Sequence, residues 1–355
     1  MAPVVQQLAT QEQIESVVCV TAQHRQMLDQ VLEIFNIRPD FDLNVMKSNQ
    51  SLSALTGHLI TGVTEVIEKC RPDYVLVHGD TTSSMASSLA AFYAKVPVGH
   101  VEAGLRTGNL QAPWPEEMNR RVNGLLANLH FAPTEGAKEN LLKEGVLDSS
   151  ILVTGNTVID ALLEVSQKIQ SSPQLNQQLT SQFSSIDFNK PLILVTGHRR
   201  ENFGQGFLEI CEALKAIATS ENVEIVYPVH LNPNVQKPVK QILGDVSGVH
   251  LISPLPYLPF VYLMMKSHLI ITDSGGVQEE APSLGKPVLV MREVTERPEA
   301  VAAGTVKLVG ANVDAIVSAT RNLLNDREEY LKMSMAHNPY GDGRASQRIV
   351  ERLLL

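Results

Sequence analysis

The chain has 355 residues, of which 44% are hydrophobic, so it is long enough for two domains that each bury a core. Its formal net charge of −9 argues against a nucleic-acid backbone as partner, although helix termini and a few arginines can still bind a diphosphate locally. Three cysteines without metal-ligand spacing, no signal-peptide pattern and no apolar run long enough for a bilayer predict a cytoplasmic protein without a membrane partner.

Short apolar runs alternate with helical patterns along the whole chain. Expected helices include residues 52–69 and 206–219, and the expected strands are 17–20, 74–78, 96–100, 151–153, 192–196, 224–229, 249–252, 269–272, 287–290 and 306–309. Fully apolar strands separated by helices are typical of parallel sheets covered on both faces, so the sequence predicts an α/β protein.

A polar segment rich in serine and glutamine, residues 167–189, is interpreted as a surface excursion beside a domain boundary. Gly155-Asn156-Thr157 just before it is a candidate hinge. We therefore expect two doubly wound, Rossmann-like domains with a cleft between them, formed by residues 1–154 plus 337–355 and by residues 155–336. Ligands bind at the carboxyl ends of strands in such folds. Because no G-x-G-x-x-G follows an expected strand, NAD is not predicted as a cofactor.

Two carboxylates of the first domain follow strands directly. Asp80 comes after the strand at 74–78 and just before a helix, so it is a candidate acid/base group or, equally, a helix N-cap. Glu102 ends an apolar, glycine-flanked strand, where burial would suit it to proton transfer. The alternative for Glu102 is an ion pair with Arg106.

Two further segments carry charged groups near expected helix starts. Pro115 suits a first helical turn, with Glu116 and Glu117 favourably placed at its positive end, and the alternative is simply a well-started helix. In the second domain, His198 and Arg199 leave a strand within a His-Arg-Arg cluster that can clamp a diphosphate. The alternative there is a solvated basic turn.

The clearest anion site is the turn after the strand at 269–272. Asp273 and Ser274 are followed by Gly275 and Gly276, and a helix-forming run then begins. Such a turn directs backbone N–H groups and the positive end of a helix dipole at one point, and glycines let phosphate oxygens approach. Glu280, about one turn into the helix, is placed to accept hydrogen bonds from sugar hydroxyls. The alternative is an ordinary strand–turn–helix connection.

These segments resemble, in order and across nearly the whole chain, the non-hydrolysing UDP-N-acetylglucosamine 2-epimerases of bacteria. The matching motifs are His78-Gly79-Asp80-Thr81-Thr82, His100-Val101-Glu102-Ala103-Gly104-Leu105-Arg106-Thr107, Pro113-Trp114-Pro115-Glu116-Glu117, Gly197-His198-Arg199-Arg200-Glu201-Asn202, Asp273-Ser274-Gly275-Gly276 and Glu296-Arg297-Pro298-Glu299. The resemblance implies a GT-B-like fold, a homodimer, and interconversion of UDP-N-acetylglucosamine and UDP-N-acetylmannosamine, which supplies ManNAc for surface polysaccharides.

The resemblance also implies a mechanism and a set of site residues, without a required metal. UDP is expelled after loss of the C2 proton, and 2-acetamidoglucal is reprotonated on the opposite face before UDP returns. Asp80, Glu102 and Glu116 match the family's carboxylates, without assignment to a face of C2, and His198 matches the histidine near the diphosphate. The positions expected to bind substrate are Arg120, Arg199, Phe260, Ser274, Gly275, Gly276, Glu280 and Arg297.

Some positions depart from the family's pattern. Gln23, Gln26 and His230 resemble parts of an effector site for a second UDP-N-acetylglucosamine, but Asn49 stands where those relatives have arginine. Leu255 replaces a residue that is polar in some relatives. Family members open with a strand and a Gly-Thr-Arg-Pro-Glu-type turn, whereas Met1-Ala2-Pro3 already matches the following helix, so we expect an interrupted first sheet.

Three other activities remain open on these residues. A GT-B glycosyltransferase shares the fold and the phosphate turn, but it usually needs one base rather than carboxylates around C2. A hydrolysing epimerase would release ManNAc and UDP, although the bifunctional versions carry a kinase domain for which this chain is too short. A non-catalytic protein that binds a UDP-sugar is the third alternative.

Overall fold

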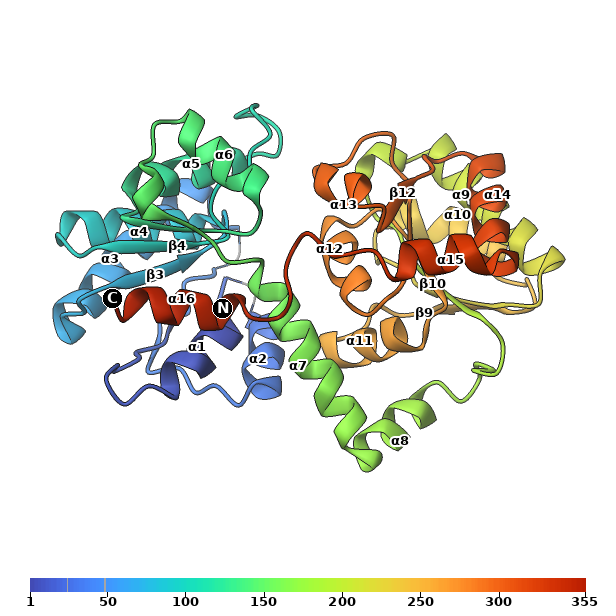
Figure 1. Ribbon diagram of the computed structural model, residues 1–355, viewed down its shortest axis with the longest axis horizontal. Coiled ribbons are helices and arrows are strands. Elements are labelled where there is room, and N and C mark those ends of the chain that lie inside the picture. The colour runs from blue at the N-terminus through green and yellow to red at the C-terminus, as the bar shows by residue number, and fades with distance from the viewer. Residues whose placement is uncertain (24, 48) are drawn as a thin grey trace. The chain divides into compact units, whose positions relative to one another are not determined.

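The computed structural model describes residues 1–23, 25–47 and 49–355. The chain divides into two compact units, of which unit 1 contains Met1–Ala161 and Tyr340–Leu355 and unit 2 contains Leu162–Pro339. Figure 1 shows that each unit consists of helices packed around a sheet. The sequence predicted a boundary before helix α7 (Thr157–Ser171). The boundary instead falls inside α7, because this helix continues from one unit into the other.

The strands of unit 1 are all parallel but form two sheets. One sheet is the pair β1 (Cys19–Val20) and β2 (Phe41–Asp42), and the other has the order β3-β4-β5-β6. The strands of the larger sheet are β3 (Val75–His78), β4 (Val98–Val101), β5 (Leu129–Ala132) and β6 (Ile151–Val153). Among the described residues the first sheet is therefore interrupted, as expected.

Helices cover both faces of the larger sheet of unit 1. The helices are α1 (Ala2–Ala9), α2 (Arg25–Ile34), α3 (Leu52–Cys70), α4 (Thr82–Tyr93), α5 (Glu116–Leu126), α6 (Glu135–Lys143) and α16 (Ala345–Leu353), with a 3₁₀ turn at Asp148–Ser150. The first and last helices, α1 and α16, lie side by side, and Val4 and Ile349 are buried with Phe131 of β5 (Figure 1). On α3 and α4, Val63 and Ala90 belong to a separate buried cluster.

Unit 2 contains one six-stranded parallel sheet with the order β12-β11-β10-β7-β8-β9. Its strands are β7 (Leu192–Thr196), β8 (Glu224–Pro228), β9 (Val249–Ile252), β10 (Leu269–Thr272), β11 (Val288–Val290) and β12 (Val306–Leu308). Its helices are the rest of α7, then α8 (Pro173–Gln182), α9 (Gln205–Ser220), α10 (Pro233–Leu243), α11 (Tyr257–Lys266), α12 (Gly275–Ser283), α13 (Pro298–Ala302), α14 (Val313–Asn325) and α15 (Arg327–Ser334), with a 3₁₀ turn at Arg200–Asn202.

The strand order of unit 2 reverses between β7 and β10, which are neighbours in the sheet. From β7 the chain proceeds to β8 and β9 on one side, and from β10 it proceeds to β11 and β12 on the other. Ligands of doubly wound sheets bind outside the carboxyl ends of strands at such a switch point. The turns that follow Thr196 and Thr272 therefore occupy the favoured binding position of this unit.

The apolar strands of unit 2 are buried on both faces, which explains their continuous hydrophobic runs. Ile193 and Val195 contribute to a core with α9, α10 and α14, whereas Leu192 and Leu194 alternate with them and are also fully buried. The expected strands at 151–153, 192–196, 249–252 and 269–272 are confirmed exactly. Strands β2 and β5 were not predicted.

The segment at residues 167–189 lies mostly at the surface beside the boundary between the units, as predicted, but it is largely helical. Helix α7 continues to Ser171 and α8 follows from Pro173. Leu179, Phe183 and Ile186 are buried, and their spacing of four and three residues follows the period of a helix rather than of a loop. No helix among residues 1–23, 25–47 and 49–355 is long and apolar enough to span a bilayer.

Candidate functional site

Asp80 follows the first strand of the larger sheet in unit 1. Thr81, not Asp80, caps helix α4 by accepting a hydrogen bond from the Ser84 N–H at 3.1 Å, so the alternative of Asp80 as the N-cap is wrong. The Asp80 carboxylate instead forms an ion pair with the Arg120 guanidinium of α5. Its side chain is therefore oriented by a helix that lies about forty residues further along the chain.

Helix α5 and strand β4 together hold the backbone at Asp80. Asn119 Nδ2 donates to the Asp80 carbonyl at 2.9 Å, and Asn123 Nδ2 donates to the Gly79 carbonyl at 3.1 Å. The fully buried His100 also contacts the Gly79 carbonyl through Nε2 at 2.8 Å. Burial lowers the pKa of His100 to about 4, so its ring is neutral near pH 7 and Nε2–H acts as the donor.

Glu102 lies directly after β4 in an unusual backbone conformation. Its φ is +64°, a left-handed value that is rare for residues other than glycine and that is found preferentially at functional sites. Glu102 Oε1 accepts a hydrogen bond from Asn156 Nδ2 at 3.0 Å. The alternative ion pair of Glu102 with Arg106 is wrong, because Arg106 pairs with Glu144 at 2.7 Å.

Asp80 and Glu102 meet at Gly79. Asp80 is the next residue in the chain, and a Cβ placed on Gly79 would lie 3.0 Å from Glu102 Oε2. Gly79 also has a φ of +67°, which disfavours any side chain there. Gly79 therefore precedes one predicted acid/base group in the chain and lies beside another in space, and a side chain at this position would crowd the Glu102 carboxylate.

The adjacent glutamates at the start of α5 have different surroundings. Glu117 is fully buried and accepts hydrogen bonds from the backbone N–H groups of Thr107 and Gly108 and from Arg120, each at 3.1 Å. Glu116 Oε2 is buried and has no hydrogen-bond partner among the described residues. Glu116 lies one helical turn before Arg120 and on the same face, so this third predicted carboxylate is next to the group that holds Asp80.

In unit 2 a buried carboxylate links the two strands of the switch point. Asp273, at the end of β10, is fully buried, and its Oδ2 accepts hydrogen bonds from the backbone N–H groups of His198 and Arg199 after β7, each at 2.8 Å. The His198 ring is 46% exposed, and its Nδ1 lies 3.6 Å from Asp273 Oδ1. Asp273 thus positions the predicted diphosphate residues, a role that the sequence analysis missed although an aspartate directly after an apolar strand was its signal.

Ser274 and the two glycines form the start of helix α12. The helix begins at Gly275, so the glycines lie in its first turn rather than before it, and no side chain of the described residues caps this end. A Cβ on Gly275 would lie 3.8 Å from both Arg199 Nη2 and Arg297 Nη2. A helix N-terminus flanked by two guanidinium groups is an anion-binding arrangement.

A buried carboxylate, Glu280, lies further along α12. Its Oε1 accepts a hydrogen bond from the Tyr257 hydroxyl at 3.0 Å, and its side chain is only 8% exposed. Burial is the main cause that raises the pKa of Glu280 to about 7; the Tyr257 hydrogen bond opposes the rise, and the nearby Glu279 adds to it. Arg297 forms an ion pair with Glu279 rather than with Glu280. Phe260, a predicted substrate-binding residue, is half-buried on α11. Tyr257 lies three residues before it on the same helix and had not been predicted as a site residue.

The expected effector residues are found in both units. In unit 1, Gln23 accepts a hydrogen bond from Ser83 Oγ at 3.2 Å, and Gln26 is exposed on α2. In unit 2, the exposed ring of His230 stacks on His198 with a centroid distance of 5.5 Å. These two histidines border a cavity of about 440 Å³, which is lined by His198, Arg199, Arg200, Glu201, Phe203, His230 and Asn232. This cavity is rich in cationic groups and lies next to the predicted diphosphate turn.

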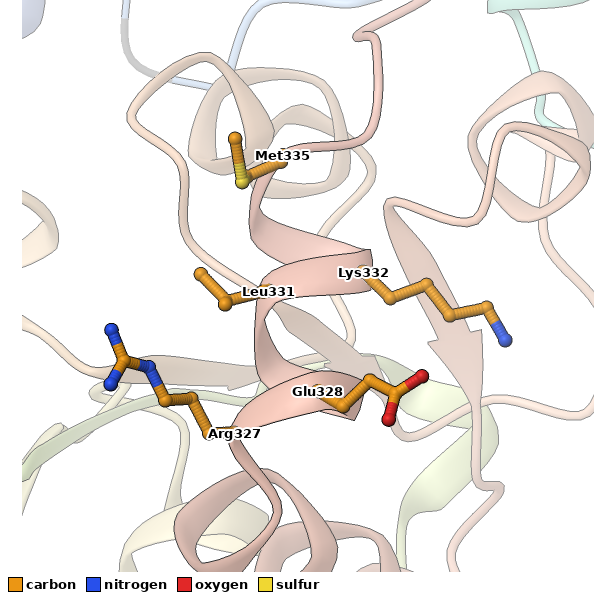
Figure 2. Close-up of a pocket in the computed structure, with 5 residues that line it drawn as sticks. All are labelled: Arg327, Glu328, Leu331, Lys332 and Met335. Carbon is orange, nitrogen blue, oxygen red and sulfur yellow. The ribbon is translucent and has the colours of Figure 1, made fainter.

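A second hollow lies on helix α15 and has a volume of about 590 Å³. Figure 2 shows the five side chains that line it, four from this helix and one from the residue that follows it: Arg327, Glu328, Leu331, Lys332 and Met335. None of the predicted site residues is among them. Within the part of the chain that the structure describes, no group of three or more His, Cys, Asp or Glu side chains could hold a metal ion. The expectation of a metal-independent reaction stays a prediction.

Known proteins resemble this chain over almost its full length. The sequence profile of the family described as UDP-N-acetylglucosamine 2-epimerase matches residues 6–354. The UDP-N-acetylglucosamine 2-epimerase of Escherichia coli K12 is 60% identical over 99% of this chain and 94% of its own length.

Solved structures agree with the sequence comparison. The UDP-GlcNAc 2-epimerase of Neisseria meningitidis, solved with UDP-GlcNAc, is 55% identical and has a TM-score of 0.92. The match covers 100% of this chain and 95% of that one. The Methanocaldococcus jannaschii enzyme, solved with UDP-GlcNAc and UDP, is 33% identical with a TM-score of 0.80, and the match covers 99% of this chain and 95% of that one. These likenesses confirm the predicted GT-B-like fold class.

Proposed function

The chain belongs to the UDP-N-acetylglucosamine 2-epimerase family, and we propose that it carries out this epimerisation by elimination and re-addition of UDP. Its activity is that of a UDP-N-acetylglucosamine 2-epimerase, because the match to relatives with this activity extends over the whole chain. The substrate is UDP-N-acetylglucosamine, and the product is UDP-N-acetylmannosamine. We infer that the product supplies ManNAc units for surface polysaccharides.

In the proposed mechanism, one carboxylate removes the C2 proton while the C1–O bond to UDP breaks, which leaves a C1–C2 double bond. A second group then delivers a proton to the opposite face of C2, and UDP adds back to C1. The proton and the UDP that leave are both replaced, so no redox cofactor is needed. General acid–base groups of this kind typically contribute about 10²–10⁴-fold to a rate.

Unit 1 supplies the acid/base groups in this proposal. The observation that carries it is that Gly79, which directly precedes Asp80, lies beside the Glu102 carboxylate, so both groups follow the paired strands β3 and β4 at the same edge of the sheet. Glu116 is the third candidate, because a buried carboxylate oxygen without a hydrogen-bond partner among the described residues is suited to proton transfer.

Unit 2 binds the UDP moiety in this proposal. The start of α12 and the guanidinium groups of Arg199 and Arg297 would hold the diphosphate, with His198 beside them. The Glu280 carboxylate would accept hydrogen bonds from the ribose hydroxyls, and Phe260 would contact the uracil. Because Asp273 fixes the His198–Arg199 turn at the switch point, this arrangement is already organised in the protein alone.

Isotope exchange tests the reaction. We expect that incubation with UDP-N-acetylglucosamine in heavy water places deuterium at C2 of both epimers, because the abstracted proton exchanges with solvent before reprotonation. Nuclear magnetic resonance and mass spectrometry measure the incorporation. A glycosyltransferase would leave C2 unlabelled, and a hydrolysing enzyme would accumulate free ManNAc and UDP. Interconversion without deuterium at C2 would refute the elimination mechanism.

We also propose that the protein is a cytoplasmic homodimer. Three apolar side chains are exposed on the neighbouring helices α4 and α5: Phe92 is 57% exposed, Tyr93 is 68% exposed and Leu125 is 84% exposed. These side chains support an interface on unit 1. The three cysteines Cys19, Cys70 and Cys211 are free, which is typical of a reducing compartment. Light scattering coupled to gel filtration should give about twice the chain mass of 38.9 kDa. A monomer at micromolar concentration would contradict the dimer.

A further inference from the structure

Asn156 lies between β6 and α7, and it connects three separate segments of unit 1. Its side chain is 3% exposed. Its Nδ2 donates to Glu102 Oε1 at 3.0 Å, and its Oδ1 accepts from the Val158 N–H at 3.1 Å. Its backbone N–H donates to the Tyr340 carbonyl at 2.6 Å. The side chain is therefore fixed by its own turn while it contacts the Glu102 carboxylate.

Glu102 depends on such a contact for its orientation. A glutamate side chain has three rotatable bonds, and fixing them in one arrangement costs conformational entropy. The left-handed backbone at φ +64° adds a local strain that the surroundings must offset. The Asn156 amide meets one carboxylate oxygen, while the other oxygen lies beside Gly79. The carboxylate is thus held beside Gly79, the residue that directly precedes Asp80.

We propose that Asn156 is a positioning residue for the epimerisation, because its amide holds the Glu102 carboxylate in the orientation needed for proton transfer at C2. The inference rests on the proposed function, in which Glu102 acts at C2. Asn156 acts through Glu102 in this proposal, since its Nδ2 donates to the carboxylate while its Oδ1 is held by the Val158 N–H. Misplacing a catalytic group by about 1 Å can cost about 10²-fold in rate.

The position of Asn156 in the chain adds to its importance. The chain leaves unit 1 through α7, which starts at Thr157, and it returns at Tyr340. The outgoing and returning segments touch, because a Cβ on Gly155 would lie 3.1 Å from the Gly341 Cα. Glu102 is therefore held by a residue of the outgoing segment whose backbone is bonded to the returning one. The orientation of the carboxylate is coupled to both connections of unit 1.

Charged groups near Glu102 must be constant in any test of this contact. The Met1 α-amino group interacts with Glu102 and with Asp160, and burial lowers the pKa of that amino group while the two carboxylates raise it. Burial holds the pKa of His78 well below its ordinary value, and the same amino group and His100 lower it further. These groups are unchanged by substitutions at residue 156, so differences between the variants report the Asn156–Glu102 contact.

Two substitutions separate the contact from the local turn. In Asn156→Ser the hydroxyl can still accept from the Val158 N–H, as serine does in similar turns, but it is too short to reach Glu102. In Asn156→Asp the shape is retained and the donor is replaced by a second carboxylate. The matched control is Asn140→Ala, which removes an amide that donates to the Gly104 carbonyl at 3.0 Å close to Glu102 in sequence.

We expect Asn156→Ser to lower kcat by about tenfold to a hundredfold with little change in KM or in UDP affinity, because unit 2 is untouched. In Asn156→Asp, the limb of the pH–rate profile that reflects Glu102 should move to higher pH, since a neighbouring carboxylate disfavours the ionised form. In a Glu102→Gln background, Asn156→Ser should have little further effect, because groups that act as a unit are non-additive. Asn140→Ala should leave the pH profile in place.

Full kcat in Asn156→Ser would overturn the inference, and so would an effect that adds completely to that of Glu102→Gln. If both Asn156 variants lost kcat without a pH shift and to the same extent as Asn140→Ala, the role of Asn156 would be structural and the inference would fail. The proposed function is tested separately, because the wild-type protein must interconvert the epimers with deuterium at C2. A wild type that does so while the Asn156 variants behave normally would leave the function intact.

Discussion

Replacing Glu280 with glutamine should stabilise unit 2 at neutral and alkaline pH, and it should change the stability little near pH 5. The Glu280 side chain is 8% exposed, and burial raises its pKa from 4.5 to about 7. In the unfolded chain the carboxyl ionises near its ordinary pKa, so between these two values ionisation favours the unfolded state and the free energy of unfolding falls as pH rises. Glutamine has the same shape, and its oxygen can still accept from Tyr257.

The size of the effect follows from the two pKa values. The rise in the pKa of Glu280 from 4.5 to about 7 lowers the free energy of unfolding of the wild type by about 3 kcal/mol at pH 8. At pH 5 the same rise lowers it by less than about 1 kcal/mol. With a urea m-value of about 2 kcal/mol/M, the Glu280→Gln midpoint should exceed that of the wild type by about 1.5 M at pH 8. Urea titrations followed by far-ultraviolet circular dichroism at pH 5, 6, 7 and 8 measure the difference.

The neighbouring Glu279 provides the matched control. It is also buried, but it forms an ion pair with Arg297, so Glu279→Gln should lower the free energy of unfolding by about 3 kcal/mol at pH 8 by leaving a buried cation without its partner. The two substitutions on one helix should therefore act in opposite directions. A Glu280→Gln midpoint equal to or below that of the wild type at pH 8, or a difference that is constant with pH, would refute the reasoning.

The remaining predictions concern turnover and ligand binding. Asp80→Asn, Glu102→Gln and Glu116→Gln should each lower kcat by about a hundredfold or more, measured by coupled assay or by C2 deuterium exchange, and near-normal rates in all three would remove the proposed mechanism. Ser274→Ala should mainly weaken UDP binding in calorimetry, with the fold unchanged, because Ser274 precedes the first turn of α12. Unchanged affinity would place the diphosphate elsewhere.

Much of the strand pattern could be predicted from sequence because apolar runs in parallel sheets are uninterrupted. Leu269–Thr272 is an example, since all four residues are buried and Asp273 ends the run. Strand β5 was missed because His130 interrupts its apolar character and only a short turn separates it from α5. Strand β2 was missed because two residues carry no periodicity.

The candidate site shows where sequence reasoning ends. Local patterns identified Asp80 and Glu102 but suggested local partners, namely a helix cap and Arg106. Their actual partners are Arg120 and Asn156, which lie 40 and 54 residues away in the chain. Contacts over such separations depend on the strand order and on the packing of α5, and neither leaves a trace in residue spacing. The place of Asp273 directly after an apolar strand was a local signal, but its partners His198 and Arg199 lie 75 and 74 residues away in the chain.

The packing of α1 against α16 has a consequence for the synthesis of the protein. Val4 and Leu8 reach their buried positions only with Ile349 and Val350, which are translated after all of unit 2. Unit 2 is continuous in sequence and is complete before those residues leave the ribosome. Since domains fold as units while the chain emerges, unit 2 should fold first, and unit 1 should remain open until α16 has left the ribosome. During that interval the apolar strands of unit 1 are exposed to aggregation.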